Sequence, residues 1–253
     1  MNFCTKLIGI VNITPDSLSG SFQPYGVERV LKYIDSLFTD GASVVDIGAE
    51  STNPQSKEVS LEEERARLLQ VLGPIFNTFP QRIFSLDTRK AETASLFLEM
   101  GGSIINDYAG LINNNLIGVV IAYRCQYIVN HFPGRNIQEV HSREKIDSLV
   151  QVKADLLERK KYLVERGIQE RQIILDPGIG FAKSASLNWE LLGFKDSVPS
   201  ESVCIGYSKK RFLGNDRFGV EVNRQAGMIA LKTQPDYIRL HEPQILIKGE
   251  KNE

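Results

Sequence analysis

The sequence predicts a single-domain α/β protein, a (β/α)8 TIM barrel that comprises residues 1–253. Its length of 253 residues is ordinary for an eight-fold barrel. Eight short apolar, β-rich runs end near a polar residue, and segments with helical spacing separate most of them. This alternation is typical of parallel βα units. No linker, low-complexity tract or change of composition divides the chain.

The run Ile173 to Asp176 shows the strand pattern most clearly. Three apolar positions, two of them β-branched, lead into a carboxylate, and Pro177 and Gly178 then stop the strand. An aspartate at such a strand end is either a turn former or a ligand-binding group. The same pattern recurs along the chain, which favours the second interpretation. The eight predicted strands are residues 7–12, 44–46, 83–87, 104–107, 127–131, 173–176, 203–208 and 237–241.

The segments between these runs predict the helices in chain order. An apolar face over 27–38 is closed by Gly41, and Ser60 with Glu63 forms a capping-box pattern at the start of the second helix. Gly167 is the expected C-terminal cap of a long polar helix whose interleaved acids and bases indicate a solvated face. The remaining helices are expected at 91–100, 116–123, 143–166, 187–192 and 224–232.

Composition excludes several classes of protein. With 30 basic and 31 acidic residues, the chain has no net field that would attract nucleic acid or an anionic membrane. No stretch approaches 18 consecutive apolar residues and no secretory pattern opens the chain, so we expect a cytoplasmic protein. The widely spaced Cys4, Cys125 and Cys204 form no metal-type pair, and we expect buried, reduced thiols.

Because parallel strands in a barrel end at one face, the polar strand ends should converge on one pocket. An open doubly wound sheet would also bind ligands at strand ends, but it rarely needs eight such repeats. The side chains expected at the pocket are Asn12, Asp46, Asp87, Asn106, His131, Asp176, Lys210, Arg239 and His241.

These residues suggest two kinds of contact. Asp87, Asn106 and Asp176 offer acceptors and an amide, the complement of a heterocycle with an amino group and ring N–H donors. Arg239 and His241 are two positions apart on the last strand and should point to the same side, as a grip for phosphate.

The basic run at Lys209, Lys210 and Arg211 allows two interpretations. Such runs are usually solvated, but this one follows the seventh strand, where barrels often bind phosphate. No Ser/His/Asp spacing or histidine cluster for zinc is present. The sequence therefore favours positioning and electrostatics over a protein nucleophile.

At these positions the chain resembles the dihydropteroate synthase family of pterin-binding enzymes. The resemblance covers nearly the whole chain, in the family's order and spacing. The matching segments are residues 9–17, 46–52, 87–88, 105–107, 175–181, 208–210 and 239–241.

The resemblance implies a barrel that joins hydroxymethyl-dihydropterin diphosphate to para-aminobenzoate, giving dihydropteroate and diphosphate. It implies a cytoplasmic enzyme without nucleic-acid or membrane partners, and with a Mg²⁺ held by Asn12 and the diphosphate. It also implies catalytic roles for Asp87, Lys210, Arg239 and His241. The implied pterin contacts are Asp46, Asp87, Asn106, Asp176 and Lys210; the diphosphate contacts are Asn12, Arg239 and His241; the aminobenzoate contacts are Thr52, Pro54, Phe181 and Arg211.

The chain departs from the family pattern on the side of the second substrate. Leu18 and Asn53 replace an aromatic residue and an arginine in the first two loops, and Arg211 stands where the family has serine. We therefore expect weaker or altered binding of aminobenzoate and sulfonamides. The chain also ends twelve residues after His241, which is short for the family's last helix and weakens the expectation of a homodimer.

Two other functions compete with this interpretation. A pterin-dependent methyltransferase domain shares the barrel and the pterin contacts, but Arg239, His241 and Lys210 favour a diphosphate leaving group. A pterin-binding paralogue with weak or no synthase activity is the other alternative, because the loop departures affect the second substrate.

Overall fold

The computed structural model describes residues 5–13, 26–50, 59–109, 113–134 and 136–247 of the chain. All eight predicted strands are present. They are β1 (Lys6–Asn12), β2 (Val44–Gly48), β3 (Ile83–Asp87), β4 (Ile104–Asp107), β5 (Gln126–Asn130), β6 (Ile173–Asp176), β7 (Cys204–Gly206) and β8 (Tyr237–Leu240).

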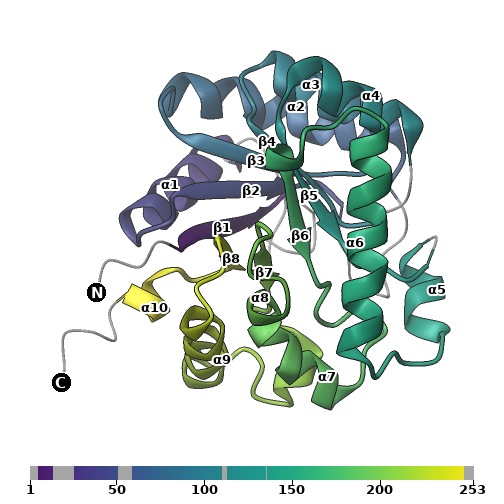
Figure 1. The fold of residues 1–253 in the computed structure, drawn as a ribbon. Helices are drawn as coiled ribbons and strands as arrows, with labels where there is room; N and C mark the ends of the chain where they lie inside the picture. The colour runs from purple at the N-terminus through teal and green to yellow at the C-terminus, as the bar shows by residue number, and fades with distance from the viewer. Residues whose placement is uncertain (1–4, 14–25, 51–58, 110–112, 135, 248–253) are drawn as a thin grey trace.

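The strands form one parallel sheet in the order β6-β5-β4-β3-β2-β1-β8-β7. A single bridge, Leu175 to Val203, joins β6 to β7, and the amide of Leu175 donates across it to Ser202 O at 2.9 Å. This β6–β7 seam nearly closes the sheet into a (β/α)8 TIM barrel, which confirms the predicted fold class (Figure 1).

Helices cover the outside of the barrel, as Figure 1 shows. The helices of six or more residues are α1 (Gly26–Thr39), α2 (Leu61–Thr78), α3 (Ala91–Glu99), α4 (Asn114–Tyr123), α5 (Ile137–Ser142), α6 (Leu149–Glu165), α7 (Ala185–Glu190) and α9 (Val220–Lys232). The single turns are α8 (Phe194–Ser197), α10 (Gln244–Ile247), η1 (Glu170–Gln172), η2 (Leu191–Gly193) and η3 (Arg211–Leu213). Among the described residues, no helix is both long and apolar enough to cross a membrane.

Local signals explain several helix ends. Ser60 caps α2 by accepting the amide of Glu63 at 3.2 Å, as its sequence pattern predicted. Gly41 and Gly167 adopt the left-handed backbone expected after α1 and α6, with φ of 95° and 105°. The two described cysteines, Cys125 and Cys204, are buried and free, as predicted, and Cys4 lies outside the described residues.

The prediction of one helix over residues 143–166 was wrong at its start. The separate helix α5 ends at Ser142, just before this segment, and α6 starts only after Ser148, whose side chain accepts the amide of Gln151 at 3.2 Å. Between the helices, Ile146 pairs in parallel with Lys183. This tertiary pairing holds the segment extended, where charge patterning alone suggested a helix.

Two apolar layers meet at the sheet. One face of the strands packs with helix residues in the main core, for example Val45, Phe84 and Leu175. The other face forms a separate cluster inside the barrel, which we call the apolar plug: Ile8, Val44, Ile104, Ile128, Ile174, Cys204 and Tyr237. Because side chains alternate along a strand, the next inward position on each strand lies two residues beyond the plug.

Candidate active site

A polar layer lies directly above the apolar plug. On five strands, the residue two positions after a plug residue is polar and buried, and together these residues line the carboxyl-end of the barrel interior. The five are Asp46, Asn106, Asn130, Asp176 and Arg239. On these strands the barrel interior therefore changes from apolar to polar between one inward-facing residue and the next.

Arg239 is the centre of this layer. Its Nη1 lies 3.0 Å from Asp46 Oδ2 and 3.6 Å from Asp87 Oδ2, and its Nη2 lies 3.8 Å from Asp176 Oδ2. Burial by itself would lower the pKa of Arg239, but the carboxylates of Asp46, Asp87 and Asp176 outweigh it and raise the pKa. Only the contact with Asp46 has hydrogen-bond length. The guanidinium is therefore anchored on β2 and faces the other two carboxylates loosely.

A chain of amides continues from Asp46. Asn106 Nδ2 donates to Asp46 Oδ2 at 2.8 Å, so its oxygen faces Asn130, whose Nδ2 donates to Asn106 Oδ1 at 3.0 Å and to Asp107 O at 3.2 Å. An ionised carboxylate only accepts, so it fixes the orientation of both amides in turn. Asn130 Oδ1 is left buried without a hydrogen-bond partner.

Several other buried acceptors in the layer also lack a hydrogen bond. They are Asp46 Oδ1, Asp87 Oδ1 and Asp176 Oδ2, beside the donor Arg239 Nε. Burial, followed by the neighbouring carboxylate of Asp46, raises the pKa of Asp87, and Arg239 opposes this only in part. Unsatisfied buried acceptors are costly and call for donors, so the layer suits a ligand rich in N–H groups.

Asp176 both forms the turn and faces the site. Its Oδ1 accepts the amide of Gly178 at 2.7 Å, while Oδ2 is directed toward Arg239. Gly178 has φ of 64°, and a Cβ there would stand 2.1 Å from His131 O. Only glycine fits this turn. The turn-forming interpretation of Asp176 is therefore confirmed, and its second oxygen faces Arg239, where ligand binding stays a prediction.

Lys210 lies over the loop after β6. Its ammonium donates to Ile179 O and lies 4.7 Å from the ring centre of the buried Phe181. Burial lowers the pKa of Lys210 to about 8, against the opposing effect of Asp176. The next residue, Arg211, is exposed.

His241 and Asn12 lie at the rim of the layer. Ser208 Oγ lies 3.0 Å from His241 Nδ1 and accepts the amide of His241 at 3.3 Å. Ser208, in the loop after β7, thus fixes the imidazole of the residue after β8. Burial, followed by Lys209, Arg239 and Lys210, lowers the pKa of His241 to about 3. Asn12 and Asp87 lie on either side of Gly48, since a Cβ added to this glycine would stand 3.5 Å from both Asn12 Oδ1 and Asp87 Cβ. Thr52 and Pro54 lie outside the described residues.

This geometry can be compared with known proteins. Residues 8–234 match the family model described as "Pterin binding enzyme". The chain belongs to the pterin-binding enzyme family.

Dihydropteroate synthases are its relatives within this family. The chain is 36% identical to the dihydropteroate synthase of Bacillus subtilis, over 83% of this chain and 72% of that protein. A match of 33% to the probable bifunctional folylpolyglutamate synthase/dihydropteroate synthase of Halobacterium salinarum covers 94% of this chain but spans only 30% of that protein. The structure of Xanthomonas albilineans dihydropteroate synthase with 4-aminobenzoic acid is similar, with a TM-score of 0.87 and 28% identity, over 97% of this chain and 90% of that one.

One prediction for the site of this pterin-binding enzyme was wrong. His131 does not face the shared pocket: its Nε2 lies 3.0 Å from Asp155 Oδ2 on α6, outside the barrel. His131 stands three positions after the plug residue Ile128, so it points to the opposite face of the strand. The inward residue of β5 is Asn130, which the sequence interpretation missed. Strict counting in steps of two from Ile128 would have found it.

Most of the remaining described residues of the predicted site come together in this pterin-binding enzyme. Asp46, Asp87 and Asp176 share Arg239, and Asn106 joins them through Asp46. Lys210 lies over the loop that follows Asp176, and His241 lies after Arg239 on β8. The exposed Arg211 has no described contact with the layer.

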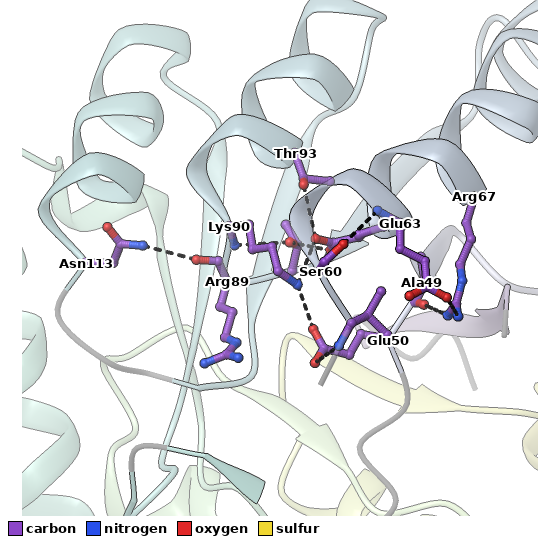
Figure 2. A network of polar contacts seen from close by, with 12 residues as sticks. Ala49, Glu50, Ser60, Glu63, Arg67, Arg89, Lys90, Thr93 and Asn113 are labelled. Atoms are coloured by element: carbon purple, nitrogen blue, oxygen red, sulfur yellow. Dashed lines mark hydrogen bonds and ion pairs between the residues drawn. The ribbon is translucent and has the colours of Figure 1, made fainter. Parts of the chain in front are cut away.

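A second polar network joins the ends of β2 and β3 on the α2 side of the site (Figure 2). Lys90 Nζ lies 2.9 Å from Glu50 Oε2 and 3.0 Å from Glu64 Oε2. Glu50 also accepts the amide of Val59 at 3.3 Å, and Arg67 donates to Ala49 O at 2.7 Å. These contacts tie α2 and the β3–α3 loop to the residues that directly follow β2.

Proposed function

We propose that this chain is a dihydropteroate synthase. It would join para-aminobenzoate to hydroxymethyl-dihydropterin diphosphate and release diphosphate. The observation that carries the proposal is the cluster of buried acceptors around Arg239, in which Asp46, Asp87 and Asp176 each keep an oxygen without a hydrogen bond. Its membership of the pterin-binding family and the likeness to known synthases support the same function.

The polar layer would bind the pterin ring. An aminopyrimidinone edge presents an amino group and ring N–H donors in one plane, and the acceptors of Asp87 and Asp176 complement them. Asn106 retains one N–H beyond its bond to Asp46, which can donate to a ring acceptor. Lys210, already seated on Ile179 O, would close the other side of the ring.

Arg239 and His241 would hold the diphosphate. Arg239 is kept cationic by its carboxylates, and its Nε has no hydrogen bond, so it can donate to a phosphate oxygen. His241 is neutral in the free protein because its pKa is lowered. A phosphate beside the ring would raise that pKa and favour the imidazolium.

The residues near Asn12 fit a magnesium ion that is held mostly by substrate. The amide oxygen of Asn12 is a suitable ligand for a hard cation, and it lies near Asp87 across Gly48. Within the described residues, no group of three His, Cys, Asp or Glu side chains could hold a metal by itself. Mg²⁺ commonly takes its other ligands from substrate phosphates and water. When bound, it would supply charge neutralisation to the departing diphosphate.

The reaction would be a substitution at the pterin methylene carbon. The aryl amine nitrogen forms the new C–N bond, the C–O bond breaks with its electron pair on the diphosphate, and the amine then loses a proton. Positive charge grows on the pterin as the C–O bond breaks, and Asp87, in its ionised form, is placed to stabilise it. Phe181, Lys210 and Arg211, with Thr52 and Pro54 outside the described residues, would meet the aminobenzoate.

The proposal is tested with the intact chain, pterin diphosphate, Mg²⁺ and para-aminobenzoate. Diphosphate release and dihydropteroate formation are measured separately, and both should proceed at equal rates. Release without dihydropteroate would mean that the second substrate is not used. If neither diphosphate nor dihydropteroate forms, the chain is a pterin-binding protein without synthase activity.

We further propose, from the family resemblance, that residues 1–253 act as one domain in a cytoplasmic homodimer. Size-exclusion chromatography with light scattering tests the assembly.

A further inference from the structure

A buried carboxylate lies outside the polar layer and contacts none of the proposed ligands. Glu64, in the first turn of α2, is 1% exposed. Its Oε1 accepts from Thr88 Oγ1 at 2.7 Å, its Oε2 accepts from Thr93 Oγ1 at 3.1 Å, and Lys90 Nζ lies 3.0 Å from the same Oε2. Three donors thus offset the cost of burying this charge. In Figure 2, Thr93 and Lys90 both lie beside the start of α2, within this network.

Thr88 is the link between this carboxylate and the site, because it directly follows Asp87 at the end of β3. Its hydroxyl donates to Glu64 and accepts the amide of Lys90 at 3.1 Å, and its own amide donates to Asn106 O at 3.1 Å. Both the side chain and the backbone of Thr88 are therefore held by hydrogen bonds. Asp87 is the last residue of the β3 ladder, where it pairs with Gly48 and Asn106, and the fixed Thr88 follows it directly.

Beyond the backbone pairing of β3, the side chain of Asp87 has few contacts to hold it. Its Oδ1 has no hydrogen bond, and within the described residues the polar contact of its Oδ2 is the one with Arg239, at 3.6 Å. A carboxylate without strong hydrogen bonds of its own depends on its backbone for position. The position of the Asp87 backbone is set on its C-terminal side by Thr88 and Glu64.

We propose that Glu64 and Thr88 are positioning residues, which hold Asp87 in place for contact with the pterin ring. The inference rests on the proposed function, in which Asp87 binds the pterin. It predicts that a buried hydroxyl bound to Glu64 matters for pterin binding only when it adjoins Asp87.

The test compares two matched substitutions, Thr88→Val and Thr93→Val. Both threonines are buried, both donate to Glu64, and valine has the same shape without the hydroxyl. Thr88→Val should weaken binding of the pterin diphosphate about tenfold, because small displacements of a binding group are costly. Thr93→Val should leave it within about twofold, with a comparable loss of thermal stability. Thr88→Ser should restore the affinity.

A double-mutant cycle shows whether Thr88 acts through Asp87. Thr88→Val should weaken pterin binding when it is introduced into the wild type. It should have no further effect when it is introduced into Asp87→Asn, because the carboxylate that Thr88 positions is then already absent. Additive effects would overturn the proposal. Should Thr88→Val not fold, Glu64→Gln provides the same comparison with Thr93→Val.

Binding is measured by calorimetry with pterin diphosphate and Mg²⁺, so that the result does not depend on turnover. A wild type that binds the pterin but forms no dihydropteroate would refute the synthase function and still test Thr88. A wild type that does not bind it would overturn both proposals. Equal affinities of Thr88→Val and Thr93→Val would overturn this inference alone.

Discussion

At the scale of single residues, several buried polar groups of the site have no hydrogen-bond partner in the ligand-free protein. Asn130 illustrates this, because it is fully buried, its amide group holds Asn106 in place and its oxygen has no partner. Such a group is expensive in a folded core and becomes useful only when a ligand supplies a donor.

We therefore expect Asn130→Ala to weaken pterin binding about tenfold, through the lost acceptor and the freed Asn106. Isothermal titration with pterin diphosphate measures the change. Gln172→Ala is the matched control, since Gln172 is also a buried amide, bound to Cys125 O at 2.8 Å and Gln169 N at 3.0 Å at the opposite end of the barrel. The role of Asn130 would be refuted if both variants bound as the wild type does.

Asp87 should make the stability of the free protein depend on pH. Its folded pKa is raised, chiefly by burial and then by Asp46, so the folded state binds the proton more tightly than the unfolded chain does. Its contribution to stability is therefore present at acidic pH, below the ordinary aspartate pKa. It is lost as the pH rises through the folded value.

Asp87→Asn removes this dependence, so the variant should become more stable than the wild type as the pH rises from 4 to 9. Each unit of pKa shift corresponds to about 1.36 kcal/mol. Thermal melts across this pH range measure the difference, with the exposed Asp35→Asn on α1 as the control. A constant difference between the melting curves at all pH values would contradict the expectation.

At the scale of elements, the loops after β5 and β6 are joined by one buried lysine. Lys183 is 4% exposed, and its ammonium donates to His131 O at 3.2 Å, Gly178 O at 2.9 Å and Phe181 O at 3.0 Å. On the helix side, Arg159 of α6 donates to Asn130 O at 2.8 Å. The strand ends that carry Asn130 and Asp176 are thus held by side chains from outside the barrel.

Lys183→Met should lower the free energy of unfolding by about 2–4 kcal/mol, because three buried carbonyl oxygens lose a charged donor. Urea denaturation gives the value. Lys161→Met on the exposed face of α6, where the ammonium lies 3.9 Å from Glu165, should change stability by less than about 0.5 kcal/mol. A loss for Lys183→Met as small as that of the control would show that the three contacts contribute little.

At the scale of the whole molecule, the barrel is least closed between β6 and β7. Only the bridge from Leu175 to Val203 crosses this seam, whereas every other neighbouring strand pair has a continuous ladder. Asp176 and Lys210 lie on either side of it. A ligand that contacts both would therefore also close the barrel.

Native-state hydrogen exchange should show this difference. The amide of Leu175, which donates across the seam, should exchange through an opening of lower free energy than the amides of Val45 and Ile47 in the central β2. Saturating pterin diphosphate should slow Leu175 more than it slows β2. Equal protection of the amides in all strands, with and without ligand, would contradict the expectation that the barrel opens most easily between β6 and β7.

The sequence by itself determined the fold and most of the site. Eight apolar runs with polar ends predicted the strands, and the convergence of parallel strand ends placed Asp46, Asn106, Asp176 and Arg239 at one pocket, since the pattern of each run is local. The family motifs added the roles proposed for these residues. Asn130 could also have been found by counting from Ile128, whereas the rule of taking the polar residue that ends the run 127–131 selects His131.

The tertiary structure alone decided which charges face each other. That Arg239 pairs with Asp46 at 3.0 Å while Asp87 keeps a free oxygen depends on contacts between β8, β2 and β3, which no local pattern encodes. The same holds for Glu64, whose place in a charged first turn of α2 predicts a solvated residue. Its burial against Thr88 and Thr93 arises only when α2 packs beside β3 and α3, because the cost of desolvating a charge depends on partners distant in sequence.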